Sequence, residues 1–148
     1  MKIKTLFLSL FTICLALLTI GPASAFTYAT ATKTARMNSV VTQIDAGTGN
    51  GKLEIGTTGM ATICATITLN KASGTVASGV LTLSGFPKTV AASATCTAAE
   101  ARIRDSANTD IITGFTVGTS GTNIILDNVS INSGQNVTIN ASPTITHY

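Results

Sequence analysis

The sequence predicts a mainly β domain: an antiparallel β-sandwich or jelly-roll-like domain with one amphipathic helix at its N-terminal end. Three observations lead to this class. Short segments with apolar residues at every second position recur from residue 52 onward, which is the period of half-buried strands. Clusters of Gly, Asn, Ser and Asp separate these segments and supply turns. One earlier segment has the period of a helix instead.

Residues 1–25 are predicted to be a secretory signal peptide. Lys2 and Lys4 make the start basic, residues 6–20 are mostly apolar, and Ala23 and Ala25 are the small residues that signal peptidase requires. The apolar run is shorter than the roughly 20 residues that cross a membrane, which disfavours an uncleaved anchor. Cleavage after Ala25 would leave one domain, residues 26–148, in the bacterial periplasm or outside the cell.

The charge of that domain excludes an electrostatic attraction to nucleic acid or to anionic membranes. The whole chain has a net charge of +3, and removal of Lys2 and Lys4 leaves +1. Binding to nucleic acid normally needs a strongly basic surface. No later segment is apolar enough to span a membrane. We therefore expect protein partners or self-association, with no nucleic acid and no membrane contact after cleavage.

Residues 34–46 are predicted to form the helix. Four apolar residues recur at positions i, i+3, i+4 and i+7 and define its core face: Met37, Val40, Val41 and Ile44. Thr32 or Thr34 can cap the start, and Gly47 stands where a helix usually stops. We expect this face to pack on the sheet.

The strands are predicted after the helix, and seven regions show apolar alternation: residues 52–55, 63–69, 81–83, 99–104, 111–117, 124–126 and 137–139. Val, Ile and Thr favour strands in these regions. Such close spacing is typical of antiparallel sandwiches.

Cys64 and Cys96 are predicted to form one disulfide, because an even number of cysteines in an oxidising compartment usually pairs. Two separate buried thiols are the alternative. Closing a loop of this length stabilises a fold by about 3–4 kcal/mol. The alternation places the Cys64 side chain on the strand face away from Ile63 and Ala65. It likewise places Cys96 on the face away from Ala99. We therefore expect a bridge between neighbouring strands on the outer face of the sheet.

We expect no enzymatic activity, no catalytic residue, no cofactor and no metal site. His147 is the single histidine and lies in the C-terminal tail, which leaves no His-based triad or multi-His site. Glu54 and Glu100 occupy strand positions expected to face solvent, where contacts with Lys52 or Arg102 are favoured over a glycosidase pair.

Three motifs suggest binding chemistry but have simpler interpretations. The stretch "DAGTGNGKLEIG", residues 45–56, lacks the Walker A pattern and its strand-to-helix context, so it is predicted to join the helix to the first strand. "DSANTD", residues 105–110, is predicted to be a hairpin turn rather than a calcium loop. Asn128, Asn136 and Asn140 match glycosylation sequons and are interpreted as turn and strand residues, with modification left open.

Several segments together resemble small structural proteins of tailed-phage and prophage virion modules. The residues that carry this resemblance are "ARMNSVVTQIDAG", "KLEIGTTG", "ATITL", "TAAEARIRDSANTDIITGFTVGTSG" and "VSINSGQNVTINASPTIT". The resemblance covers nearly all of residues 26–148. It implies a β domain that assembles by contacts rather than by catalysis. The signal peptide and the cysteine pair are additions to the family pattern, and they suggest recruitment for export by a prophage or its host.

The leading functional hypothesis is an exported, non-enzymatic structural or interaction protein of the phage-structural type. The first alternative is a subunit of a surface fibre or adhesin, because "FTYATAT", residues 26–32, alternates and could donate a strand to a neighbour. The C-terminal run "NVTINASPTITHY" also alternates, loosely as in chaperone-assembled pilins. A secreted hydrolase is the weakest alternative. Glycan binding by a surface groove stays open.

Overall fold

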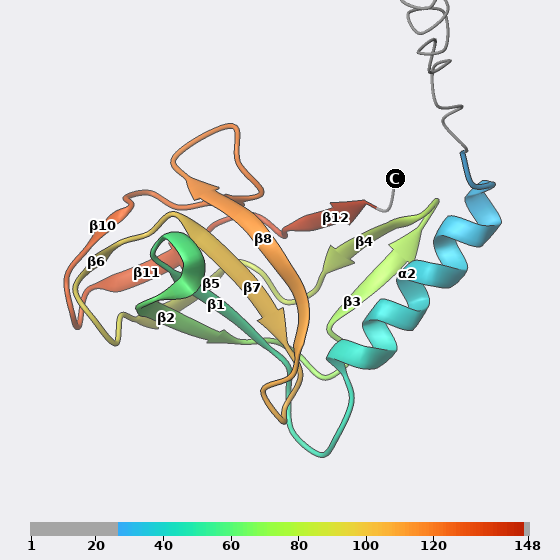
Figure 1. Ribbon diagram of the computed structural model, residues 1–148, viewed down its shortest axis with the longest axis horizontal. Helices are drawn as coiled ribbons and strands as arrows, with labels where there is room; N and C mark the ends of the chain where they lie inside the picture. Colours follow the sequence, from blue (N-terminus) through green and yellow to red (C-terminus); the bar gives the residue numbers. More distant parts are fainter. Residues whose placement is uncertain (1–26, 147–148) are drawn as a thin grey trace, which may run out of the picture.

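The computed structural model describes residues 27–146 (Figure 1). The predicted signal peptide, its cleavage residues Ala23 and Ala25, and His147 lie outside the described residues. Within them, the fold is mainly β with one α-helix, which confirms the predicted class. The helix is α2 (Thr30–Ile44), and a 3-10 turn, η1 (Thr58–Met60), follows the first strand.

The described chain forms twelve strands, most of them short. They are β1 (Lys52–Gly56), β2 (Ile63–Thr68), β3 (Gly74–Ala77), β4 (Val80–Leu83), β5 (Lys88–Ala91), β6 (Cys96–Thr97), β7 (Glu100–Arg104), β8 (Asp110–Gly118), β9 (Ile124–Ile125), β10 (Ser130–Ile131), β11 (Asn136–Ile139) and β12 (Thr144–Thr146).

Four sheets make up the β-sandwich-like domain. The largest has the strand order β2-β1-β7-β8-β9, and a three-stranded sheet has the order β12-β4-β3. Two pairs, β10-β6 and β11-β5, complete the fold. All pairings are antiparallel except that of β8 with β9. Two antiparallel pairs of the first sheet join consecutive strands, β1 with β2 and β7 with β8, and the turn at 105–109 connects the second pair. The pairing of β1 with β7 joins strands that are far apart in the chain.

The core lies between the large sheet and the smaller ones. On β1, Leu53 and Ile55 are fully buried, and their partners on β2, Ile67 and Ala65, are buried with them. Strands of the other sheets contribute buried residues to the same cluster, for example Leu81 of β4. The predicted alternation therefore places one face of β1 and β2 in the core, as expected for half-buried strands.

Helix α2 begins at Thr30 rather than residue 34 and ends at Ile44 rather than residue 46. Its N-cap is Ala29, without a side-chain cap, and the Oγ1 of Thr34 instead accepts a hydrogen bond from the N–H of Gly79 (3.0 Å). The helix packs against β3 and β4 at one end of the molecule (Figure 1).

The apolar face of α2 points toward the sheets. Met37 and Ile44 are buried, while Val40 and Val41 are partly buried against the core. The helix ends where Asp45 takes a non-helical conformation and its carboxylate accepts the N–H of Ser73 (3.1 Å to each oxygen). This tertiary contact holds the end of the helix. Gly47 follows two residues after Asp45 with φ +79, a conformation that favours glycine, as expected for the point where a helix stops.

Cys64 and Cys96 form the predicted disulfide, with their Cα atoms 5.9 Å apart. The predicted location on the outer face is wrong, because Cys64 is fully buried. The bridge also links two different sheets, from the edge strand β2 to β6 of the β10-β6 pair.

A β-bulge explains why the alternation predicted the wrong direction for the side chain of Cys64. Gly56 pairs with Ile63 and Ile55 pairs with Ala65, so Cys64 is an extra residue on β2 with no partner on β1. A bulged residue leaves the strict up-and-down order of a strand. Cys64 therefore turns inward. On the other side, Cys96 belongs to the short strand β6, separate from β7, so the alternation of β7 does not extend to it.

Candidate functional site

The side chain of Glu54 lies on the face of the large sheet away from the core, but the residue is only 7% exposed, so the prediction that it faces solvent is wrong. Its Oε2 accepts a hydrogen bond from the Nε of Arg102 (2.8 Å) and lies 3.6 Å from Nη1 of Arg104. Cross-strand pairing of Glu54 with Arg102 agrees with the sequence prediction. The two arginine side chains cover the carboxylate.

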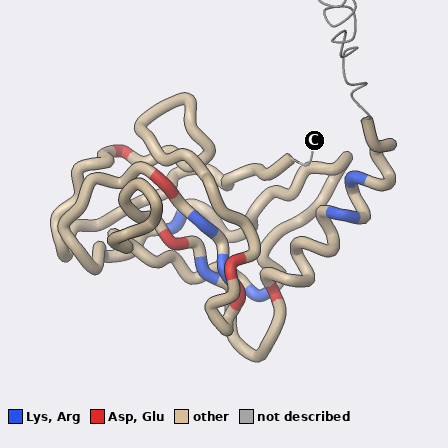
Figure 2. Tube along the Cα trace, in the orientation of Figure 1, with Lys and Arg blue, Asp and Glu red and all other residues tan. Residues whose placement is uncertain are grey.

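Asp110 extends this network onto β8. Its Oδ1 lies 2.8 Å from Nε of Arg104, and its Oδ2 lies 3.6 Å from Nη1 of Arg102. The buried Nε of Arg104 makes no hydrogen bond, so the first contact is an ion pair. Figure 2 shows acidic and basic positions, in red and blue, close together on the strands in the middle of the molecule. The network joins β1, β7 and β8 and leaves neither carboxylate free.

Glu100 lies near η1 and does not join the arginine network. Its Oε2 accepts the N–H of Gly59 (3.0 Å), so the predicted contact with Lys52 or Arg102 is wrong. Gly59 has φ +69 and holds a turn conformation that favours glycine. Lys52 instead donates to Oδ1 of Asn108 in the hairpin turn (2.8 Å).

The glycine-rich stretch between α2 and β1 surrounds an ammonium group. The Nζ of Lys71 donates to the backbone carbonyl oxygens of Asp45 (2.7 Å), Gly47 (2.7 Å) and Gly49 (3.1 Å). Phosphate sites present backbone N–H groups, whereas this loop presents carbonyls to a cation. The stretch joins the helix to β1, which confirms the predicted helix-to-strand junction. The role of Lys71 was not predicted from the sequence.

The two remaining motifs lie in turns and strands, as expected, and the sequon residue Asn136 is the first residue of β11. In "DSANTD", Oδ1 of Asp105 accepts the N–H groups of Ala107 (2.9 Å) and Thr109 (2.7 Å), which closes the hairpin between β7 and β8. Among the sequon residues, Asn128 bonds to Ser130 in the same way and Asn140 donates to Asp127 (2.8 Å).

Within residues 27–146, no three His, Cys, Asp or Glu side chains gather closely enough to hold a metal ion. Helix α2, the one α-helix of the described chain, is neither long nor apolar enough to cross a membrane.

Two strands, β2 and β5, lie side by side without forming a ladder. At one end the N–H of Ser93, just after β5, donates to the carbonyl of Cys64 (2.8 Å). At the other end the Nζ of Lys88 reaches across to the carbonyl of Thr68 (2.8 Å) and to Oδ1 of Asn70 (2.9 Å). The strands thus run antiparallel and separate toward Lys88.

An open groove of about 430 Å³ lies between these separating strands. Its lining consists of residues 66–68 from β2 and residues 87–90 on and next to β5. We call this groove the β2–β5 wedge. Thr66, Thr68 and Thr89 give it polar walls of strand-forming residues, and Lys88 is the one charged residue of the lining.

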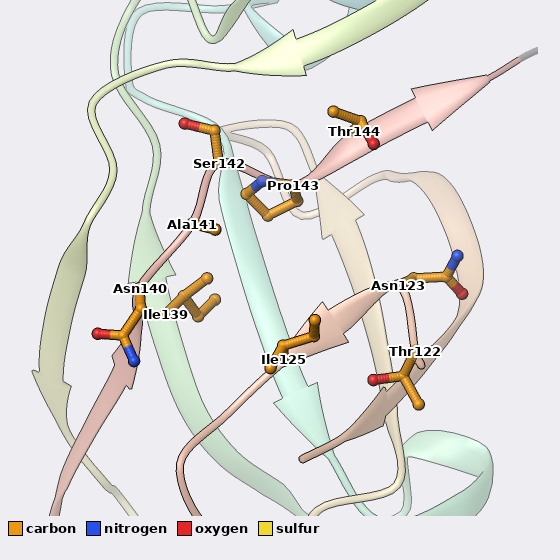
Figure 3. Close-up of a pocket in the computed structure, with 9 residues that line it drawn as sticks. All are labelled: Thr122, Asn123, Ile125, Ile139, Asn140, Ala141, Ser142, Pro143 and Thr144. Atoms are coloured by element: carbon orange, nitrogen blue, oxygen red, sulfur yellow. The ribbon is translucent and has the colours of Figure 1, made fainter. Parts of the chain in front are cut away.

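A second, neutral pocket of about 240 Å³ lies between the segment before β9 and the β11–β12 connection (Figure 3). Ile125 is 48% exposed here, while Ile139 is buried. The Oδ1 of Asn123 accepts from the N–H and Oγ1 of Thr116 (both 2.9 Å). Amide and hydroxyl groups thus surround an apolar floor, and no charged side chain lines it.

Comparisons with protein-family models, with curated proteins and with solved structures find no match to this chain. Within residues 27–146, the structure shows a mainly β fold with the Cys64–Cys96 disulfide, ion pairs that join Glu54 and Asp110 to two arginines, and an open groove between β2 and β5.

Proposed function

We propose that this chain is an exported, non-enzymatic structural or interaction protein of the phage-structural type. The observation that carries this proposal is the use of its carboxylates. The sequence has six acidic residues, all of them within the described range, and each accepts a hydrogen bond or forms an ion pair within the fold: Asp45, Glu54, Glu100, Asp105, Asp110 and Asp127. Acid–base catalysis needs a carboxylate that can exchange protons with a substrate.

The open surfaces support contact with other proteins. The β2–β5 wedge presents strand edges, and unpaired strand edges are templates for pairing with another chain. The disulfide is compatible with a periplasmic or extracellular location, where thiols are oxidised. Export by a signal peptide cut after Ala25, and origin from a prophage module, belong to the same proposal and rest on the sequence.

Cellular fractionation and cross-linking test this proposal. The full chain is produced in a bacterial host, and the exported form is isolated from the periplasm or medium. We expect its N-terminal sequence to begin at Phe26, and we expect cross-linking in place to trap it with itself or a partner protein. Retention in the cytoplasm would contradict export, and an isolated monomer in every cross-linking experiment would contradict the interaction role.

The fibre or adhesin subunit remains the alternative proposal. The start of α2 at Thr30 argues against donation of "FTYATAT", because residues 30–32 are helical rather than extended. Strand β12 favours the alternative, since it is short, alternates, and forms an edge of its sheet. Ladders that resist SDS and disappear on heating would support a fibre. No observation favours a hydrolase.

A further inference from the structure

The outer edge of β12 presents open backbone groups. The N–H of Leu83 donates to the carbonyl of Pro143 (3.0 Å), so Pro143 and Ile145 bond toward β4. In an antiparallel pair, the residues between these point their N–H and C=O groups the other way. Thr144 and Thr146 therefore present their backbone groups at the sheet edge, where no described strand pairs with them. The donor that Pro143 lacks would face β4, so the outer edge loses none.

The other edges of the two larger sheets are covered, distorted or short. Helix α2 lies beside β3 (Figure 1), and β5 partly occupies the edge of β2, to which it bonds at Ser93. The part of β8 that β9 leaves unpaired carries Asp110 and two register shifts, with Gly114 at φ +80. Strand β9 has two residues. Charges and bulges keep edges from pairing with other chains, and β12 has neither.

The sequence of β12 is self-complementary. Thr-Ile-Thr reads the same in both directions, so two antiparallel copies centred on Ile145 place Thr144 of each copy opposite Thr146 of the other. Threonine pairs across strands are favourable, and no like charges meet in this register. Ile145 is only partly buried against the core, and the two isoleucines would cover each other. The strand therefore matches a second copy of itself.

We propose that β12 pairs antiparallel with β12 of a second copy, about a two-fold axis at Ile145. Thr144 of each copy exchanges two backbone hydrogen bonds with Thr146 of the other, and the two three-stranded sheets join edge to edge. This inference rests on the proposed interaction role and names a second copy as the partner. The contact is isologous and closes on itself, so it gives dimers rather than ladders.

The residues that follow β12 extend this contact toward the neutral pocket. The pocket lies at the start of β12, with Ser142 and Pro143 in its lining (Figure 3). Tyr148 follows β12 by two positions, outside the described residues. In the two-fold register, Tyr148 of the second copy comes opposite Ser142. Ile125, 48% exposed at the pocket, offers its ring an apolar surface.

Engineered cysteines test the register. Ile145→Cys should form a disulfide between two identical chains, because facing residues at a non-hydrogen-bonded position have Cα atoms about 4.5 Å apart, within the range of a disulfide. Thr144→Cys alone should not, since its two copies lie beyond the roughly 7 Å that a disulfide spans. A mixture of Thr144→Cys and Thr146→Cys should cross-link. Non-reducing electrophoresis of the oxidised protein separates these outcomes.

A backbone substitution tests the hydrogen bonds. Thr146→Pro removes an outward N–H without touching the β4 ladder, and proline is tolerated on edge strands. The contact is small, so we expect a dissociation constant of roughly 0.1–1 mM for the wild-type dimer. Thr146→Pro removes two bonds per dimer and should raise this constant about tenfold or more. Thr146→Val keeps the N–H and is the matched control. Sedimentation over a range of concentrations measures the dimer, and native melting temperatures establish folding.

A pair of substitutions tests the pocket. Tyr148→Ser and Ile125→Ser should each weaken the dimer, and the double variant should be no weaker than either one, because both remove the same contact. Additive losses would remove Tyr148 from the pocket.

Several results would overturn the pairing of β12. One is a monomer at every concentration up to the millimolar range; others are equal dimerisation of Thr146→Pro and Thr146→Val, or cross-linking by Thr144→Cys alone. Ladders larger than dimers that Thr146→Pro abolishes would assign the edge to a fibre contact instead. Complexes with another protein that persist in Thr146→Pro cells would leave the interaction role intact while removing this self-pairing from it.

Discussion

Lys71 shows how a single side chain can organise a loop that has little structure of its own. Three backbone carbonyls of the segment between α2 and β1 converge on its ammonium group. The glycines allow this path, since a Cβ at Gly47 or Gly49 would press on the side chain of Ser106, and Gly47 has φ +79. The sequence pattern identified the junction, but the partner lies more than twenty residues away and leaves no local signal.

Replacing Lys71 by Met should destabilise the fold by about 1–2 kcal/mol, because three carbonyl acceptors lose their donor and must be hydrated. Urea unfolding measures the change. Potassium or ammonium chloride should restore part of the loss in Lys71→Met by occupying the carbonyl site, while tetramethylammonium chloride at equal ionic strength should not. Equal responses to all three salts would contradict a specific cation site.

Glu54 is the other residue with a large expected effect. Glu54→Gln should lower the free energy of unfolding by about 3 kcal/mol, because Arg102 and Arg104 would then face each other without the buried carboxylate between them. Asp110→Asn is the matched control: its side chain is 42% exposed, and its loss should cost under about 1 kcal/mol. Chemical denaturation compares them, and similar losses would contradict a central role for Glu54.

At the scale of elements, the long periodic segments were predictable, whereas the short strands β3, β5, β6 and β10 were not. The stripe of α2 and the alternation of β1 and β7 each repeat several times, so one face is clearly apolar. Strand β5 has Val90 as its one large apolar residue, and β3 has only Val76. Such strands form because a neighbour pairs with them, and their own residues carry too little pattern to show it.

The apolar face of α2 should depend more on its fully buried position Ile44 than on its partly buried position Val40. Ile44→Ala is expected to destabilise the domain by about 2–4 kcal/mol, because the side chain is fully buried and a cavity would remain. Val40→Ala, at a partly buried position of the same face, should cost less. Thermal unfolding followed by circular dichroism measures both, and the reverse order would contradict the observed packing.

For the whole molecule, the sequence predicted the class of fold, an antiparallel β-sandwich, but it did not predict which strands pair with each other. Alternation shows which face of a strand is buried, but it does not show which edges pair. The wedge and the link between β2 and β6 both depend on that choice. The bulge at Cys64 further shows that one inserted residue can reverse an inference from alternation.

The disulfide should stabilise the whole domain. Cys64→Ala with Cys96→Ala is expected to lower the free energy of unfolding by about 3–4 kcal/mol, mainly because the unfolded chain gains freedom. The oxidised wild-type protein, denatured without reductant, should show no free thiol from Cys64 or Cys96 in a titration. Two reactive thiols would contradict the bridge, and the double variant with unchanged stability would contradict its contribution.

The same bridge also limits how far the folded chain can extend under force. It spans 32 positions of the chain, which enclose β3, β4 and β5. If the molecule is pulled between α2 and β12, tension passes through the sulfur atoms and bypasses those strands. An extended chain spans at most about 3.5 Å per residue, so roughly 110 Å of contour length stays locked while the bridge is intact. An assembly built from this domain would therefore extend by a shorter length in an oxidising medium than in a reducing one.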